Sequence, residues 1–195
     1  MQEIGAGSMA ERVGVPVRSI QFWTDAAVLR PLPETERMGR GRHRVYPANP
    51  PWFGELVWAF IAAELNRLAL PVGTMRRVID LLRRNAVLLD TTEPSRWAQS
   101  MMFHPVGRAL QGHQALIIVP LPLADRWINV EINEAERKPE ILHVFGPDPN
   151  VGIGEGEEEP QYSKKIVQFP GDFVTEHRSG YLLNLFKILE PLRTG

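Results

Sequence analysis

Arginine side chains gather in one short, glycine-containing stretch of the chain. Around Gly39 and Gly41 stand four arginines and one histidine, namely Arg37, Arg40, Arg42, His43 and Arg44. The guanidinium group of arginine is planar, permanently charged and able to donate paired hydrogen bonds, so it is well suited to bind phosphate. Residues 30–51 are rich in proline and glycine and cannot continue a helix. We therefore expect an exposed hairpin, or wing, that presents these groups to a polyanion.

The charge of the chain is unevenly divided between its two halves. Its 195 residues carry 22 bases and 23 acids, a formal net charge of -1. Residues 1–84 hold twelve arginines and eight carboxylates, a net charge of +4, whereas the remainder carries −5. A basic module is thus joined to an acidic one, which predicts that the first half binds a polyanion and the second does not. Chance scatter of solvated charges is the alternative that charge alone leaves open.

Other kinds of chemistry find little support in the composition. The chain contains no cysteine, which excludes disulfides, thiolate metal sites and cysteine nucleophiles. Its five histidines are scattered, and no paired carboxylates, nucleophile elbow or HExxH-like segment stands out, so we expect no metal, no cofactor and no enzymatic activity. No apolar run is as long as a membrane span and the N-terminus lacks the layout of a signal peptide, which predicts a cytoplasmic protein.

The first half of the chain begins with two segments whose apolar residues recur at helical spacing. A short helix is expected over residues 8–13, where Gly14 ends it, and a second over residues 16–27, where Pro16 suits the first turn. The apolar positions of this second helix are Val17, Ile20, Phe22 and Trp23. Two helices joined by a turn that contains glycine make a helix-turn-helix unit.

Two further helices are expected after the basic stretch. Apolar residues at three- and four-residue intervals predict a long helix over residues 52–68 and a shorter one over residues 72–82, with Pro71 between them. The shorter helix is expected to pack back against the longer one. The arginines that fall mainly between the apolar positions, and that we expect on a solvated face, are Arg67, Arg76, Arg77, Arg83 and Arg84.

The second half predicts a smaller α+β domain over residues 114–195, after a linker with short helices over residues 85–113. Its apolar runs and period-two alternation predict the strands of an antiparallel sheet, over residues 115–119, 128–132, 140–145, 165–169 and 173–177. A terminal helix is expected after Ser179, with an apolar stripe formed by Tyr181, Leu182, Leu185, Phe186, Leu189 and Leu192. We expect this domain to serve in sensing or oligomerisation.

Several segments of the first half occur in an order that is typical of one family. They are MAERVGVPVRSIQFW, AAVLRP, GRGRHRVYP and LNRLALPVGTMRRVIDLL. Over about residues 4–84 this series resembles the winged helix-turn-helix of the MerR family of transcriptional regulators. The resemblance implies a mostly α DNA-binding domain over residues 1–84, with the second helix in the major groove and the wing on the adjacent backbone.

The resemblance also assigns DNA-binding residues. Arg18, Ser19 and Gln21 match the outward face of the recognition helix, where arginine reads guanine or grips a phosphate and glutamine reads adenine. The wing residues implied to contact phosphate, without reading bases, are Arg40, Arg42, His43, Arg44 and Tyr46. The alternatives are solvated helix residues for the first three and core packing for Tyr46. Phe22 and Trp23 stand where family members often carry two tyrosines, and we expect both rings in the core.

The function implied is that of a transcriptional regulator that binds double-stranded promoter DNA as a homodimer, with RNA polymerase as a further partner and an effector that the sequence does not identify. Pro94 and Pro105 shorten the long helix through which such regulators usually dimerise, so the second domain or its last helix is expected to do so instead. A phage-type DNA-architecture protein, such as an excisionase or the small subunit of a packaging enzyme, is the alternative, since both reuse this winged module. A small enzyme or protein-interaction module is the third class.

Overall fold

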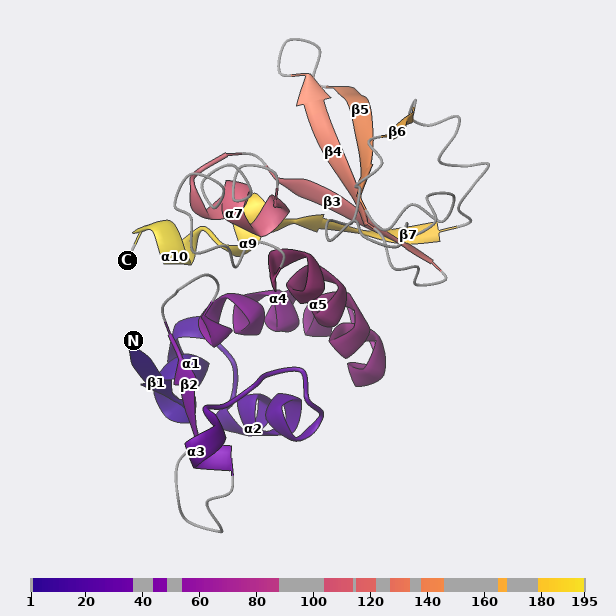
Figure 1. Ribbon diagram of the computed structural model, residues 1–195. Helices are drawn as coiled ribbons and strands as arrows, with labels where there is room; N and C mark the ends of the chain where they lie inside the picture. The colour runs from indigo at the N-terminus through magenta and orange to yellow at the C-terminus, as the bar shows by residue number, and fades with distance from the viewer. Residues whose placement is uncertain are drawn as a thin grey trace, which may run out of the picture. The chain divides into compact units, whose positions relative to one another are not determined.

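The computed structural model describes residues 2–36, 44–48, 54–87, 104–113, 115–121, 127–133, 138–145, 165–167 and 179–194 (Figure 1). The chain forms two compact units, one of Met1–Trp97 with Thr194–Gly195 and one of Ala98–Arg193. Within the described ranges, no helix is both long and apolar enough to cross a membrane.

The first unit opens with two helices joined by a tight turn, as the sequence predicts. Helix α1 (Ala6–Val13) ends at Gly14, whose φ of 72° lies in the left-handed region that glycine adopts at low cost. Helix α2 (Val17–Asp25) follows directly, with Pro16 at its N-cap. The buried side chains of α1 are Ala6, Met9, Ala10 and Val13. The turn at Gly14 thus sets the angle between α1 and α2.

A two-stranded antiparallel sheet joins the N-terminus to the end of the basic stretch. Strand β1 (Glu3–Gly5) pairs with β2 (Val45–Pro47), and Ile4 lies opposite Tyr46. The sequence did not predict β1, because three residues are too few to show a period of two. The short helix α3 (Pro33–Glu36) precedes the gap at residues 37–43, so most of the expected wing lies outside the described residues.

The predicted third and fourth helices are present, but their relative lengths are reversed, since the third has 13 residues and the fourth has 16. Helix α4 (Glu55–Arg67) and helix α5 (Val72–Val87) pack against each other on either side of a turn that contains Pro71. Gly54, the N-cap of α4, approaches the carbonyl of Ala48 so closely that any Cβ would collide with it. The fully buried large side chains of this unit are Met9, Ile20, Trp23, Leu29, Tyr46, Ile61, Leu65, Met75, Ile79 and Leu82.

The second unit holds an antiparallel sheet in the order β6-β5-β4-β3-β7. Its strands are β3 (Leu116–Leu121), β4 (Trp127–Asn133), β5 (Lys138–Phe145), β6 (Lys165–Val167) and β7 (Ser179–Asn184). Strands were predicted at the first four positions, and these predictions are confirmed; the strand expected at residues 173–177 lies outside the described residues. Helix α7 (Pro105–Leu110) belongs to this unit, and the side chain of His104 caps it by accepting the Val106 N–H.

The terminal helix expected after Ser179 is wrong in its start and in its exposed stripe. Residues Ser179–Asn184 form β7, which pairs with β3 from Leu121 back to Leu116. Only then do the short helices α9 (Leu185–Ile188) and α10 (Pro191–Thr194) follow. A short apolar run such as Tyr181–Leu183 does not distinguish a strand from a helix by itself, and pairing with β3 decides for the strand. Within the stripe, Leu185 and Leu189 are fully buried and offer no dimerisation surface, whereas Phe186 and Leu192 are half-buried.

Candidate nucleic-acid interface

Helix α2 buries one face and exposes the other. Ile20, Trp23 and Thr24, spaced three and four residues apart, are 0%, 2% and 9% exposed. The exposed residues of the helix are Val17, Arg18, Gln21, Phe22 and Asp25, while Ser19 is half-buried. The structure therefore brings the predicted Arg18 and Gln21 together on one outward face, with Ser19 at its edge. We call these five exposed residues the α2 face.

The two adjacent aromatic residues of α2 have opposite fates. Trp23 lies in the core as expected, but Phe22 is 56% exposed, so its predicted burial is wrong. Consecutive residues of a helix point about 100° apart, and the core that holds Trp23 cannot also receive Phe22. The α2 face thus carries a large apolar ring beside its polar groups.

Tyr46 is a core residue, which corrects its expected role in phosphate contact. Its side chain is fully buried, and its hydroxyl lies 2.8 Å from the hydroxyl of Thr24. The Thr24 hydroxyl donates its proton to the carbonyl of Ile20 at 2.8 Å, so the Tyr46 hydroxyl is the donor between the two. Burial raises the pKa of Tyr46, against the lowering effect of that hydrogen bond. Tyr46 therefore ties β2 to α2 and positions the α2 face.

Among the described residues, Arg44 is the member of the expected wing whose side chain lies beside α2 and is accessible to solvent. Its Nη1 lies 2.6 Å from Oδ1 of Asp25 at the C-terminal end of the helix, and the two side chains are 32% and 63% exposed. An ion pair this accessible contributes at most about 1 kcal/mol, so another anion can replace the carboxylate. Arg40, Arg42 and His43 lie outside the described residues.

Hydrogen bonds connect the described residues that precede and follow positions 37–43. The backbone N–H of Leu32 donates to the carbonyl of Val45 at 2.8 Å, and the N–H of Val45 donates to the hydroxyl of Thr35 at 3.2 Å. The described residues on either side of positions 37–43 are therefore held at one place on the first unit. This place adjoins the α2 face, because Arg44 next to Val45 reaches Asp25.

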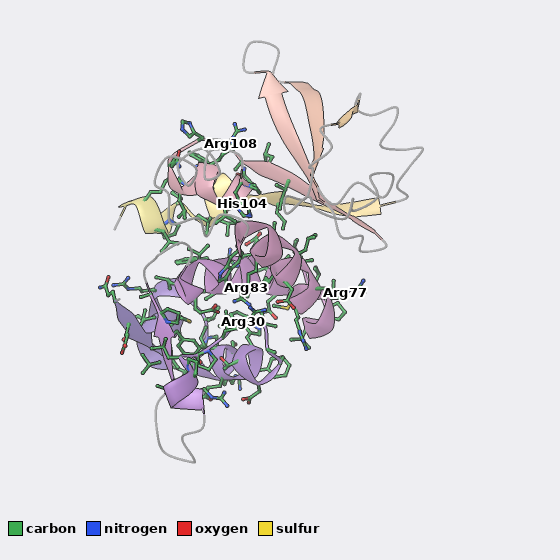
Figure 2. The ribbon with its side chains drawn as sticks, in the orientation of Figure 1. Arg30, Arg77, Arg83, His104 and Arg108 are labelled. Atoms are coloured by element: carbon green, nitrogen blue, oxygen red, sulfur yellow. The ribbon has the colours of Figure 1, made fainter. Side chains whose placement is uncertain are left out.

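A buried ion pair fixes the segment that leaves α2. The guanidinium of Arg83 donates to both carboxylate oxygens of Glu55, at 2.7 and 2.8 Å, and to the carbonyl of Val28 at 3.0 Å. The carboxylate also accepts the backbone N–H of Arg30 at 2.9 Å. Figure 2 shows Arg30 and Arg83 between α2 and the α4–α5 pair. The exit of α2 is thereby bonded to both of the later helices.

Arg83 is not on a solvated face, and its expected exposure is wrong. The side chains of Arg83 and Glu55 are 7% and 8% exposed, and the guanidinium lies 5.2 Å from the centre of the Trp58 ring. Burial raises the pKa of Glu55, against the lowering effect of Arg83, and burial lowers the pKa of Arg83. The charge of each group therefore opposes the effect of burial on the pKa of the other. Spacing could have indicated this, because Arg83 follows buried Ile79 by four residues.

Exposed arginines lie at the outer edge of this cluster. Arg30 Nη2 lies 2.8 Å from Oδ1 of Asp80, and Arg76 Nε lies 3.5 Å from Oδ2 of the same carboxylate. Their side chains are 61% and 55% exposed. With the buried pair included, three guanidinium groups surround two carboxylates, so the cluster keeps one positive charge. It adds to the positive field of the first unit.

In the part of the chain that the structure describes, no group of three or more histidine, aspartate or glutamate side chains could hold a metal ion. Comparison of the chain with protein-family models, with curated proteins and with solved structures finds no match. Its function must therefore be argued from the α2 face and its surroundings.

Proposed function

We propose that this protein is a sequence-specific DNA-binding transcriptional regulator that inserts α2 into the major groove of duplex DNA. The observation that carries the proposal is the α2 face, in which Arg18 and Gln21 project from a helix that is anchored by Ile20 and Trp23. Arginine donates two hydrogen bonds to guanine and glutamine pairs with adenine, both in the major groove. An α-helix fits that groove, and residues near its N-terminal end reach the base edges.

The position of Arg44 supports a second contact on the DNA backbone. Its guanidinium lies beside the C-terminal end of α2 and faces an exposed carboxylate that a phosphate oxygen can replace. The described residues on either side of the 37–43 segment, which includes Arg40 and Arg42, are held at one place. In the proposal this segment is the wing of a winged helix-turn-helix like that of the MerR family, and it fixes the register of α2 on the duplex.

The net charge of residues 1–84, +4, favours the approach of a polyanion to the first unit, whereas the acidic remainder disfavours its approach to the second. We assign the second unit, with its antiparallel sheet, to sensing or assembly. A homodimer would place two α2 helices on a two-fold symmetric site, and RNA polymerase would be the partner of a promoter-bound regulator.

Binding-site selection from random duplex DNA with the purified full chain tests the proposal, followed by affinity measurements over a salt series. Arg18→Ala should reduce the ratio between selected and unrelated duplexes. Arg44→Ala should weaken all duplexes alike and lower the salt slope by about 0.9 of a unit, the value for one lost phosphate contact. Mapping of occupied sites along the genome then distinguishes a regulator, found at promoters, from an architectural protein.

Arg67→Ala is the matched control, because Arg67 is 71% exposed on α4, outside the α2 face, and its loss changes the net charge equally. It should leave discrimination between sequences unchanged. If Arg18→Ala and Arg44→Ala bind like the unmodified protein, or no more weakly than Arg67→Ala, the proposed interface is wrong.

A further inference from the structure

The α2 face carries exposed apolar side chains as well as polar ones. Among the described residues, the large apolar side chains that are exposed are Val17 at 44%, Phe22 at 56% and Leu68 at 45%. Two of these three lie on the nine-residue helix α2. A single exposed apolar residue needs no explanation. Two of them on the face that is proposed to enter the groove indicate that this face contacts an apolar group.

The two apolar residues occupy the margins of the α2 face. At 3.6 residues per turn, its five members span an arc of about 140°, with Val17 at one edge and Phe22 at the other. Each apolar residue has a polar neighbour one turn away, because Phe22 follows Arg18 by four residues and Gln21 follows Val17 by four. Val17 and Phe22 are therefore the helix-face neighbours of the two residues that are proposed to contact bases.

We propose that Phe22, assisted by Val17, recognises the C5-methyl group of thymine, so that α2 reads thymine in addition to the bases read by Arg18 and Gln21. This inference rests on the proposed function. The thymine methyl is an apolar group on the floor of the major groove, and cytosine carries only hydrogen at the same atom. Phe22 has no hydroxyl with which to bond a phosphate, and its ring lies outside the protein core, so burial against a methyl group is the contact that its chemistry favours.

Deoxyuridine substitution tests the proposal, because it removes the thymine methyl and leaves base pairing intact. In the duplex selected by the unmodified protein, each thymine is replaced in turn and the affinity is measured. Burial of one methyl group corresponds to about fourfold in affinity, so we expect a loss of about three- to fivefold at one or two positions. Phe22→Ala should bind more weakly and lose this sensitivity, whereas Phe22→Leu should keep it. The exposure of Phe22 makes both variants compatible with folding, which circular dichroism verifies.

The outcomes separate this inference from the proposed function. If the unmodified protein shows no salt-dependent, sequence-selective binding, the proposed function fails. If it binds selectively but deoxyuridine has no effect, or the same effect on Phe22→Ala, thymine recognition by Phe22 is overturned and the function stands. A shift of the DNA-free protein from dimer to monomer in sedimentation of Phe22→Ala would also overturn it, since Phe22 would then cover a second copy of the chain.

Discussion

Replacement of Arg83 by methionine removes one half of the buried ion pair. It leaves the carboxylate of Glu55 buried without the guanidinium that neutralises it. Both side chains are more than 90% buried, and the guanidinium supplies two of the hydrogen bonds that the carboxylate accepts. Loss of one partner of such a pair costs about 3–5 kcal/mol, because the other charge remains desolvated. That is a large part of the total stability of a domain, which is about 5–15 kcal/mol.

The double variant Arg83→Met with Glu55→Gln tests whether the cost comes from the stranded charge. Glutamine removes the charge, and its side-chain oxygen can still accept the Arg30 N–H that Glu55 accepts at 2.9 Å. We expect the double variant to recover at least about 2 kcal/mol of the loss in the single variant. Urea unfolding of the full chain, followed by far-ultraviolet circular dichroism and tryptophan fluorescence, measures both values for the transition of the first unit.

The exposed pair of Arg67 with Glu64 provides the control. Its arginine side chain is 71% exposed, so Arg67→Met should cost less than about 1 kcal/mol. A cost of Arg83→Met no larger than that of this control, or a double variant less stable than the single one, would show that the unpaired Glu55 carboxylate does not destabilise the first unit.

Three further outcomes are expected from features in and around α2. Burial raises the pKa of the Tyr46 hydroxyl above its ordinary value of 10.0, so as the pH rises the unfolded chain loses the hydroxyl proton before the folded chain does. The stability that the protonated hydroxyl contributes is therefore complete below about pH 10 and is lost as the pH rises through the pKa of the folded state. Tyr46→Phe should flatten that alkaline loss and reduce stability at neutral pH by about 0.5–1.5 kcal/mol, as measured by urea unfolding at several pH values. Asp25→Asn removes an anion from the α2 face and frees Arg44, so it should tighten binding to all duplexes by about three- to fivefold at low salt, and Arg44→Ala should reduce this gain to the part that comes from the lost anion. Ala27 has a φ of 56°, in the left-handed region that glycine favours, so Ala27→Gly should raise stability by about 0.5 kcal/mol after the entropy of the unfolded chain is offset. Ala26→Gly, at a φ of −82°, should lower stability, and equal effects of the two substitutions in thermal unfolding would contradict this account.

Local signals were sufficient to predict most of the helical part of the fold. Gly14 marks the end of α1 because its left-handed conformation is a property of that one residue, and Pro71 separates α4 from α5 because it lacks an N–H. Arg18 and Gln21, which the family resemblance assigned to an outward face, are exposed. These features need no knowledge of residues distant in the chain.

The features that sequence did not predict depend on distant partners. Strand β1 exists only through pairing with β2, forty residues later, and β7 is a strand because β3 lies beside it. Arg83 is buried because Glu55 meets it 28 residues away in the chain. Its spacing after Ile79 is compatible with the buried face of α5, but only the fold supplies the carboxylate that makes burial of an arginine possible.

The two buried polar contacts explain how one short helix can present a defined surface. Tyr46 bonds to Thr24 near the C-terminal end of α2, and Arg83 bonds to the Val28 carbonyl just beyond it. The helix is thus fixed by contacts that face the core, while the Asp25–Arg44 pair that faces solvent is weak enough to exchange. In the proposed complex with DNA, such a division lowers the entropic cost of binding, because α2 is already positioned, and leaves the proposed phosphate contact to be completed by the DNA. Tyr46→Phe should therefore weaken duplex affinity without a change in salt slope, which distinguishes a positioning residue from a phosphate contact.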